Sequence, residues 1–562
     1  MFDAIVVGSG ISGGWVAKEL TEKGLKVLVL ERGPNIEHIT DYKDSLLPWE
    51  QENEGRVAED EAQRDYAIQS TVYPFSSVNK TFWVNDRESP YSTPEGKPFT
   101  WYRGFHLGGR SLMWGRMSLR WSDLDFGANQ RDGHGSDWPI RYADLAPWYD
   151  HVEAFAGVSG SREGLHQLPD GDFLKPMGLN DVEADFKKRI EAHFPGRTVI
   201  PPRVANLSEV RSQHTDLGRG PCQYRSQCHN GCSYGAYFSS LSATLPAAKK
   251  TGNLTVITNA IVHSVIHDPR TNRVTGVRVL DTKTRKRRTY PAKMVFLNAS
   301  TIPTAQILLA STSAAFPGGL ANSSGMVGRN LMDHLGGAFA MGLYPPGFED
   351  RYYRGRRPQA NIIPRFRNVD TQEDYLRGFG MVTMAFRSNW KLASMAPIGV
   401  GAEAKQRMRA PGPWMIFAGG GGEMLPNPDN RVTLHPTRKD AWGMPIPHIE
   451  CVAGENDRKL VAAAQADAEA MLTAAGVKII AKGSKPGTPG ATIHEMGTAH
   501  MGSDPKTSVL NKYGQAHDVP NLFISDGAAM ASSATQNPSL TYMALSARAA
   551  HFAAEFLKAG AI

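Results

Sequence analysis

The sequence predicts an α/β fold into which a second, α+β domain is inserted, and three observations predict it. Residues 1–33 form one strand–helix–strand unit of the length that such units have. Residues 256–297 carry short strand-like runs, and residues 521–557 add a strand followed by a long helix. Residues 335–490 contain further strand-like pieces, which we assign to a separate lobe over the first domain.

The N-terminal unit is the clearest element. The apolar run Ala4–Val7 is typical of a buried parallel strand. A helical pattern follows over residues 14–23, and Gly24 stands where a helix commonly ends. A second apolar run, Val27–Leu30, completes the unit, which therefore predicts a Rossmann-type domain.

Three glycines and one carboxylate of this unit match a dinucleotide-binding pattern. Gly8 permits the tight turn, Gly10 lets a pyrophosphate approach the backbone, and Gly13 lets helix and strand pack closely. The helix N-terminus then offers unpaired N–H groups to the phosphates. Glu31, 18 residues after Gly13, stands where a carboxylate accepts a hydrogen bond from a ribose hydroxyl. We predict an adenine dinucleotide site here, the alternative being a glycine-rich turn without ligand.

Composition excludes several classes of protein. The 562 residues carry a net charge of +7 with a pI near 9.0, which does not demand a nucleic-acid partner. No run approaches the ~18 apolar residues of a membrane span. The first strand starts at the N-terminus without a cleavable signal, so the chain acting alone is expected in the cytoplasm. The basic run from Lys283 to Arg288 lies between two strand-like segments and predicts a solvated hairpin tip, with a docking patch as the alternative.

The remaining elements follow in chain order. The Gly108-Gly109 pair lets backbone lie against a flat ligand. Residues 137–157 predict a helix, and residues 160–215 look irregular. Asn537 and Pro538 match helix-start rules and predict a helix to about residue 557, with Asn537 as a candidate N-cap.

Three of the four cysteines lie within eleven residues, and their spacing is Cys-x5-Cys-x3-Cys. The glycine and polar residues between Cys222, Cys228 and Cys232 allow the tight turns that an iron–sulfur cluster needs, and three thiolates suit a 3Fe-4S cluster. The alternatives are a zinc site that adds His229, a disulfide with one free thiol, or plain thiols. Cys451 stands apart and predicts a buried core thiol.

Taken together, these motifs and their order resemble the glucose–methanol–choline (GMC) flavin oxidoreductases over nearly the full length. The resemblance rests on the N-terminal unit, Gly108-Gly109, residues 298–303, residues 327–334 and the block from His494 to Asn537. Within the family, the blocks His494–Thr498 and Gln536–Thr541 resemble the sugar-oxidising branch. Gly109–Gly115 and Trp138-Pro139-Ile140 are most similar to the catalytic subunit of glucoside 3-dehydrogenases within that branch.

The resemblance implies a Rossmann-type FAD-binding domain (GMC fold) with an inserted α+β substrate-binding domain. The implied FAD-binding domain comprises residues 1–40, 100–135, 215–334 (including the cysteine segment 220–235) and 490–562, and the cap lobe comprises 41–99, 136–214 and 335–489. The implied cofactor-binding residues are Gly8, Gly10, Gly13, Glu31, Gly108, Gly109, Ser111, Val262, Asp526, Gly527, Asn537 and Thr541. Pyranose oxidases of this family carry a flavin-linked histidine where this chain has Met113, and a thioether cannot form that link, so we predict non-covalent FAD.

Carried over by the motif, His494 is the candidate catalytic base and Asn537 the residue that holds the substrate hydroxyl. An imidazole titrates near neutral pH, which suits removal of a hydroxyl proton. His500, which follows in the same block of sequence, is expected to be a pocket or packing residue.

The sequence therefore predicts an FAD-dependent sugar dehydrogenase that oxidises a secondary hydroxyl, at C3 of glucose, galactose or their glycosides, to a ketone. The cysteine cluster implies electron transfer to an external acceptor such as a cytochrome c. The resemblance also implies a small partner subunit whose export signal would carry this chain to the periplasm. The alternatives are an oxygen-using sugar oxidase, a sugar-acid dehydrogenase of the gluconate type, and a flavin-free, zinc-stabilised binding protein.

Overall fold

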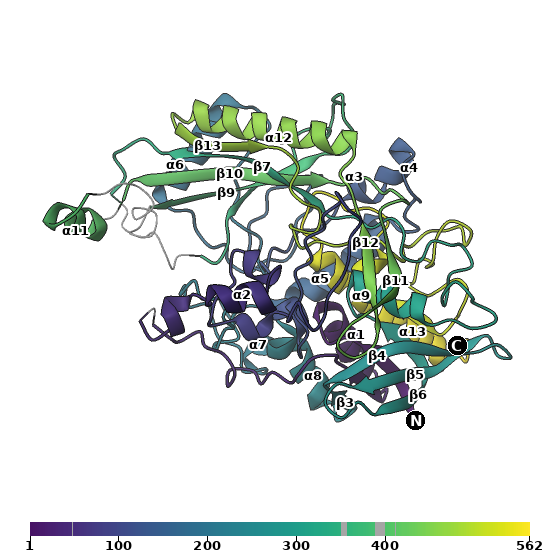
Figure 1. Ribbon diagram of the computed structural model, residues 1–562. Helices are drawn as coiled ribbons and strands as arrows, with labels where there is room; N and C mark the ends of the chain where they lie inside the picture. The colour runs from purple at the N-terminus through teal and green to yellow at the C-terminus, as the bar shows by residue number, and fades with distance from the viewer. Residues whose placement is uncertain (48, 350–356, 388–398, 411) are drawn as a thin grey trace.

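The computed structural model describes residues 1–562 except 48, 350–356, 388–398 and 411. Two sheets stand at opposite ends of the molecule (Figure 1). The larger one has the strand order β3-β2-β1-β6-β5-β4, with β14 paired to β6. Its strands are β1 (Phe2–Val7), β2 (Val27–Leu30), β3 (Leu254–Ile257), β4 (Ala260–Asp268), β5 (Arg273–Asp281), β6 (Arg287–Leu297) and β14 (Leu522–Ile524).

The larger sheet is parallel where it builds the N-terminal unit and antiparallel beyond it. β1 pairs in parallel with β2 and β6, and β14 pairs in parallel with β6. β4, β5 and β6 pair antiparallel, so the tip of the β5–β6 hairpin carries the exposed basic run from Lys283 to Arg288. The predicted α/β fold and the solvated hairpin tip are both confirmed.

The smaller sheet is antiparallel and has the order β13-β7-β10-β9-β8. Its strands are β7 (His334–Leu343), β8 (Asn361–Ile363), β9 (Phe379–Arg387), β10 (Trp414–Glu423) and β13 (Lys478–Ser484), and a separate ribbon consists of β11 (Arg431–Lys439) and β12 (Pro445–Glu450). These strands come from the part of the chain assigned to the second lobe, although the predicted division of the whole chain into two domains stays a prediction.

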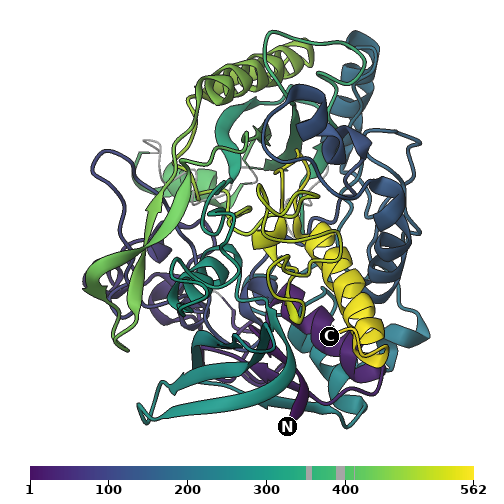
Figure 2. The same cartoon turned by 90° about the vertical axis from the view of Figure 1, so that its right-hand side faces the viewer.

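Helices cover both sheets. α1 (Ile11–Glu22) and α13 (Ser539–Lys558) lie side by side against the larger sheet, while α12 (Glu455–Ala474) covers β7, β10 and β13 (Figure 1 and Figure 2). The other helices are α2 (Glu59–Asp65), α3 (Asp123–Phe126), α4 (Ala128–Asp132), α5 (Tyr142–Ala156), α6 (Asp181–His193), α7 (Ser212–Thr215), α8 (Leu245–Lys250), α9 (Thr301–Ala310) and α11 (Ala402–Arg409). Short helical turns occur at 52–55, 69–71, 80–82, 109–112, 240–244 and 527–529.

Three sequence predictions about helices need correction. α1 begins three residues before the predicted start, because Gly10 already serves as its N-cap. Residues 160–215, expected to be irregular, contain α6, whose N-terminus is closed by reciprocal bonds between Asn180 and Glu183. α13 begins at Ser539 with Pro538 in the N-cap position, so the side chain of Asn537 does not cap the helix.

Candidate active site

One large cavity, with a volume of about 710 Å³, runs from the N-terminal glycine turn to His494 and Asn537. Most of the sequence-predicted site residues line it: Gly8, Gly10, Glu31, Gly109, Ser111, Val262, Asp526, Gly527, His494 and Asn537. Gly13, Gly108 and Thr541 lie behind its wall rather than on it. The cavity is of a size typical for small-molecule and cofactor sites.

The glycine turn leaves the N-terminus of α1 open to this cavity. Gly10 has no side-chain cap, and the position that a Cβ would take there has no atom within 4 Å. A Cβ on Gly13, in contrast, would lie 2.0 Å from the carbonyl oxygen of Gly8. Gly109 comes from a distant segment, and its missing Cβ would lie 3.2 Å from Cα of Gly10. Two glycine segments thus meet where the helix presents free N–H groups, an arrangement suited to a pyrophosphate.

This difference between two glycines can be tested. We expect Gly13→Ala to destabilise the protein by about 3 kcal/mol, because α1 must move away from the backbone of Gly8. Gly10→Ala, the matched control, should change the stability of the FAD-free protein by less than about 0.5 kcal/mol, since its methyl group points into open space. It should instead weaken FAD binding. Thermal unfolding with and without FAD measures both effects, and equal melting temperatures for Gly13→Ala and the wild type would contradict this account.

Two buried carboxylates hold the turns at the cavity wall. Glu31 accepts hydrogen bonds from the hydroxyl of Ser9 (2.5 Å) and from the N–H of Gly33 (3.0 Å), and burial raises its pKa. Asp526 accepts from the N–H of Ser300 (2.8 Å) and from the hydroxyl of Thr304 (2.7 Å). Burial raises the pKa of Asp526 to about 6. Both carboxylates fix backbone turns, and both remain on the cavity wall.

The segment from Gly108 to Ser111 is tied to the N-terminal turn. The N–H of Gly108 donates to the hydroxyl oxygen of Ser9 (2.9 Å), and Ser111 donates to the carbonyl of Gly108 (2.5 Å). Thr541 lies behind the wall, where its hydroxyl contacts that of Tyr149 (2.7 Å). These contacts hold the wall in place without reaching into the cavity.

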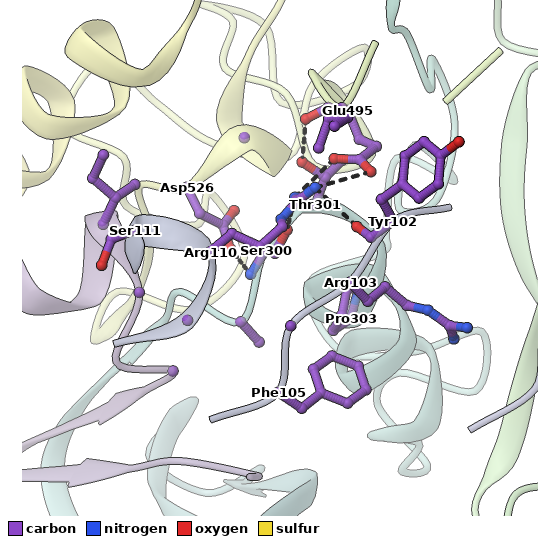
Figure 3. A pocket seen from close by; sticks show the side chains of 18 of the residues that line it. Tyr102, Arg103, Phe105, Arg110, Ser111, Ser300, Thr301, Pro303, Glu495 and Asp526 are labelled. Atoms are coloured by element: carbon purple, nitrogen blue, oxygen red, sulfur yellow. Dashed lines mark hydrogen bonds and ion pairs between the residues drawn. The ribbon is translucent and has the colours of Figure 1, made fainter. Parts of the chain in front are cut away.

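An ion pair that sequence reasoning missed crosses the cavity wall between Arg110 and Glu495. Their closest atoms, Arg110 Nη2 and Glu495 Oε2, are 2.8 Å apart, and Arg110 Nη2 also donates to the hydroxyl of Ser300 at 3.1 Å (Figure 3). The carbonyl of Glu495 accepts from the hydroxyl of Thr301 (2.6 Å). Arg110 lies within the motif Gly109–Gly115, and Glu495 lies within the block that begins at His494, in both cases next to mostly small or apolar residues. A charged residue in such a motif is the sequence feature that could have indicated this ion pair.

His494 and Asn537 meet at the cavity wall. Nδ2 of Asn537 lies 3.2 Å from Nε2 of His494, although 43 positions separate the two residues. On the other side of the ring, Nδ1 of His494 lies 3.0 Å from Nδ1 of His334. Burial, with smaller contributions from His334 and Arg110, lowers the pKa of His494 well below its usual value. The imidazole is therefore neutral at physiological pH and can accept a proton.

Asp333 holds the loop that carries His494. Its buried carboxylate accepts hydrogen bonds from the N–H groups of Gly490 (2.7 Å), Thr492 (3.2 Å) and His494 (3.0 Å), and from the hydroxyl of Thr492. Ile493, which lies between Thr492 and His494, has a positive φ of 67°, a strained conformation for a β-branched residue. In the sequence, Asp333 and His334 belong to the segment 327–334, which resembles the family. No local pattern in the sequence indicates the contacts that these two residues make.

His500 lies apart from this group. It is buried, and its Nε2 donates to the carbonyl of Thr507 (2.9 Å). It does not line the cavity, so it is a packing residue. Cys451 is a buried core thiol, as predicted.

The three clustered cysteines line a second, small hollow. Cys222, Cys228 and Cys232 are free thiols of intermediate exposure, and all three border this hollow. The backbone N–H of Tyr224 points at the sulfur of Cys222 (3.4 Å). The loop is anchored by Asp44, which accepts hydrogen bonds from the N–H (2.9 Å) and hydroxyl (2.6 Å) of Ser233.

The described residues show the three cysteines as free thiols, without an assembled metal site. Within the residues that the structure describes, no three ligating side chains are arranged to hold a metal ion. His229 does not border the hollow, and its Nδ1 lies 3.3 Å from the carbonyl oxygen of Met113 instead. This part of the chain therefore supports neither the predicted iron–sulfur cluster nor the zinc site, and the three thiols form no disulfide. Among the described residues, no helix has the length and apolarity of a membrane span.

Comparisons with known proteins cover the whole chain. Two family models, both described as GMC oxidoreductase, match residues 2–336 and residues 426–546. The fructose dehydrogenase large subunit of Gluconobacter japonicus is 29% identical over 99% of this chain and 98% of its own length. The 2-methyl-1,2-propanediol dehydrogenase of Mycolicibacterium austroafricanum is 29% identical over 98% and 94%. Pyridoxine 4-oxidase from Mesorbium loti shares the fold, with a TM-score of 0.60, 16% identity and 98% and 99% coverage.

Proposed function

Since this chain belongs to the GMC oxidoreductase family, we propose that it is an FAD-dependent sugar dehydrogenase that oxidises a secondary hydroxyl to a ketone. The observation that carries the proposal is the pair of His494 and Asn537, 3.2 Å apart on the wall of the cavity that also contains the glycine turn. A proton acceptor and an amide thus share one space with a dinucleotide motif.

GMC oxidoreductases bind FAD, and the residues of the cavity fit it. The open N-terminus of α1 and Gly10 would hold the pyrophosphate, while Glu31 and Val262 would contact the adenosine part. Met113 lines the cavity and cannot form the link that a histidine makes, which supports non-covalent binding. When bound, FAD supplies the acceptor for a hydride.

His494 and Asn537 supply the two contacts that an alcohol needs as it is oxidised. Nε2 of His494 would accept the proton of the substrate hydroxyl. Nδ2 of Asn537 would donate to the same oxygen and hold the carbinol carbon in place. The O–H proton would go to the imidazole, and the carbinol hydrogen would leave with the C–H electron pair as a hydride, for which bound FAD would be the acceptor, as the carbon–oxygen double bond forms. Desolvation lowers the pKa of His494 and keeps the ring neutral, ready to accept this proton.

A sugar substrate is supported by the sugar named in the fructose dehydrogenase relative and by the residues that resemble the sugar-oxidising branch. We propose C3 of glucose, galactose or a glycoside as the position oxidised, on the motifs Gly109–Gly115 and Trp138-Pro139-Ile140. An oxygen-using sugar oxidase and a sugar-acid dehydrogenase are alternative outcomes of the test.

The test is anaerobic addition of D-glucose, D-galactose, methyl glucosides, D-fructose and D-gluconate to the purified flavoprotein. Bleaching of the flavin absorption by an aldose or glycoside, with a 3-keto product, is the expected result. Bleaching by gluconate alone would favour the sugar-acid dehydrogenase, and rapid reoxidation by oxygen without added dye would favour the oxidase. A flavoprotein that none of these compounds bleaches would overturn the assignment to sugars.

We also propose a 3Fe-4S cluster at Cys222, Cys228 and Cys232, which would pass electrons to an external acceptor such as a cytochrome c. Three free thiols around one anchored hollow support it. A small partner subunit with an export signal, and hence a periplasmic location, belongs to the same proposal and is supported by the large-subunit relative.

Metal analysis checks this prediction. We expect about three irons per chain and a broad brown absorption beneath the flavin bands, both lost in Cys228→Ser. Cys451→Ser is the matched control, since that thiol is buried in the core far from the hollow in sequence. Wild-type protein that contains flavin but no iron would show that the cysteines have another role.

A further inference from the structure

We propose that His334 is a positioning residue for the proposed reaction, because it holds His494 in the tautomer that is protonated on Nδ1. This leaves the lone pair of His494 on Nε2, the nitrogen beside Asn537. The inference rests on the proposed function, in which His494 accepts the hydroxyl proton.

A backbone carbonyl fixes the proton of His334. Nε2 of His334 lies 2.9 Å from the carbonyl oxygen of Ser533. A carbonyl oxygen only accepts hydrogen bonds, so Nε2 of His334 must carry the proton. Burial lowers the pKa of His334, so the ring is neutral and its Nδ1 is an acceptor.

The unprotonated Nδ1 of His334 then determines which nitrogen of His494 carries the proton. Nδ1 of His334 accepts from Nδ1 of His494 at 3.0 Å, which requires the proton of His494 to be on Nδ1. Nε2 of His494 is therefore unprotonated and accepts from the amide Nδ2 of Asn537 at 3.2 Å. One carbonyl thus determines the direction of three consecutive hydrogen bonds.

Four separate segments hold this chain of hydrogen bonds in register. His334 is the first residue of β7, paired with Glu423 of β10. The hydroxyl of Ser533 donates to the carbonyl of Met424 (3.0 Å), and Ala534 adopts a φ of +55°. Such a strained backbone persists only where its surroundings fix it. The ring centroids of His334 and His494 are 4.8 Å apart with an edge-on angle of 73°.

The proton position of His494 determines which hydrogen bonds a bound alcohol could make. A substrate hydroxyl inserted between the side chains finds an acceptor at Nε2 of His494 and a donor at Nδ2 of Asn537, the two partners it needs. In the other tautomer, Nε2 of His494 would carry a proton and could not accept one. The two Nδ1 lone pairs of the histidines would also face each other across 3.0 Å.

The test compares two variants with different acceptors. In His334→Asn, Oδ1 takes the place of the imidazole Nδ1 and still accepts from His494. In His334→Phe, no acceptor remains. We expect His334→Phe to lower the maximal rate of flavin reduction by D-glucose or methyl β-D-glucoside roughly 10²-fold with a smaller change in KM. His334→Asn should stay within about tenfold of the wild type. His500→Asn, which alters a buried histidine that also donates to a carbonyl, should match the wild type.

A substrate-independent readout separates this inference from the proposed function. In protein labelled with [15N]histidine, the hydrogen-bonded N–H signal of His494, assigned by its absence in His494→Gln, should belong to Nδ1. The nitrogen is identified because Nδ1 couples to one ring C–H and Nε2 to two. The signal should persist in His334→Asn and vanish in His334→Phe.

A signal from Nε2–H of His494, or an unchanged Nδ1–H signal and rate in His334→Phe, would overturn the inference. If no sugar reduces the flavin, the proposed function fails, while the NMR measurement still tests the tautomer.

Discussion

Replacing His494 with glutamine should lower the rate of flavin reduction by sugar about 10²–10⁴-fold while FAD stays bound. Glutamine can donate and accept hydrogen bonds at this place, but it has no group that takes up a proton near neutral pH. His494 lies on the cavity wall in contact with His334 and Asn537. Stopped-flow reduction under nitrogen measures the effect, and the flavin spectrum of the purified variant reports binding.

The matched control is His500→Gln, because His500 is also a histidine with a lowered pKa but contacts Thr507 away from the cavity. Its rate should equal that of the wild type. Because the pKa of His494 is lowered well below its usual value, the wild-type rate should also stay level as the pH falls from 8 to 6. Full activity in His494→Gln would show that another group removes the proton.

Replacing Asp333 with alanine should destabilise the protein by about 3 kcal/mol or more and abolish sugar-dependent flavin reduction. The substitution leaves the N–H groups of Gly490, Thr492 and His494 and one hydroxyl without their acceptor in a buried place, and each such loss costs about 1–3 kcal/mol before water and local shifts compensate. The loop would no longer hold His494 against Asn537. Thermal unfolding and anaerobic reduction measure the two effects.

Asp333→Asn serves as the isosteric control, since its amide oxygen still accepts while its NH₂ group does not. It should lose less stability than Asp333→Ala at pH 8. Burial raises the pKa of Asp333 to about 6, above its ordinary value of 3.8. A raised pKa in the folded state stabilises the protein fully below pH 3.8, and that contribution is lost as the pH rises through 6. This part of the pH dependence should be missing in Asp333→Asn, and an unchanged profile would contradict the account.

Local sequence patterns predicted the N-terminal unit well. β1 and β2 lie where the apolar runs indicated, because buried parallel strands read as continuous apolar segments. Gly13 could be predicted because helix–strand contact at that point leaves no room for a Cβ. α6 was missed although Asn180 and Glu183 form a recognisable capping pattern, since its overall composition is strongly polar. The sequence predicts Asn537 as a helix N-cap because it directly precedes Pro538. In the structure its side-chain amide contacts His494 instead.

The sequence by itself determined the fold class, the family, the glycine turn and the candidate pair of His494 and Asn537, since these depend on short spacings along the chain. Only the tertiary structure decided which groups surround that pair. His334 is the first residue of β7, Asp333 directly precedes that strand, and the carbonyl of Ser533 belongs to a loop. The proton position and pKa of an imidazole are set by neighbours through space at about 3 Å, and such neighbours are brought together by sheet pairing and packing rather than by sequence spacing.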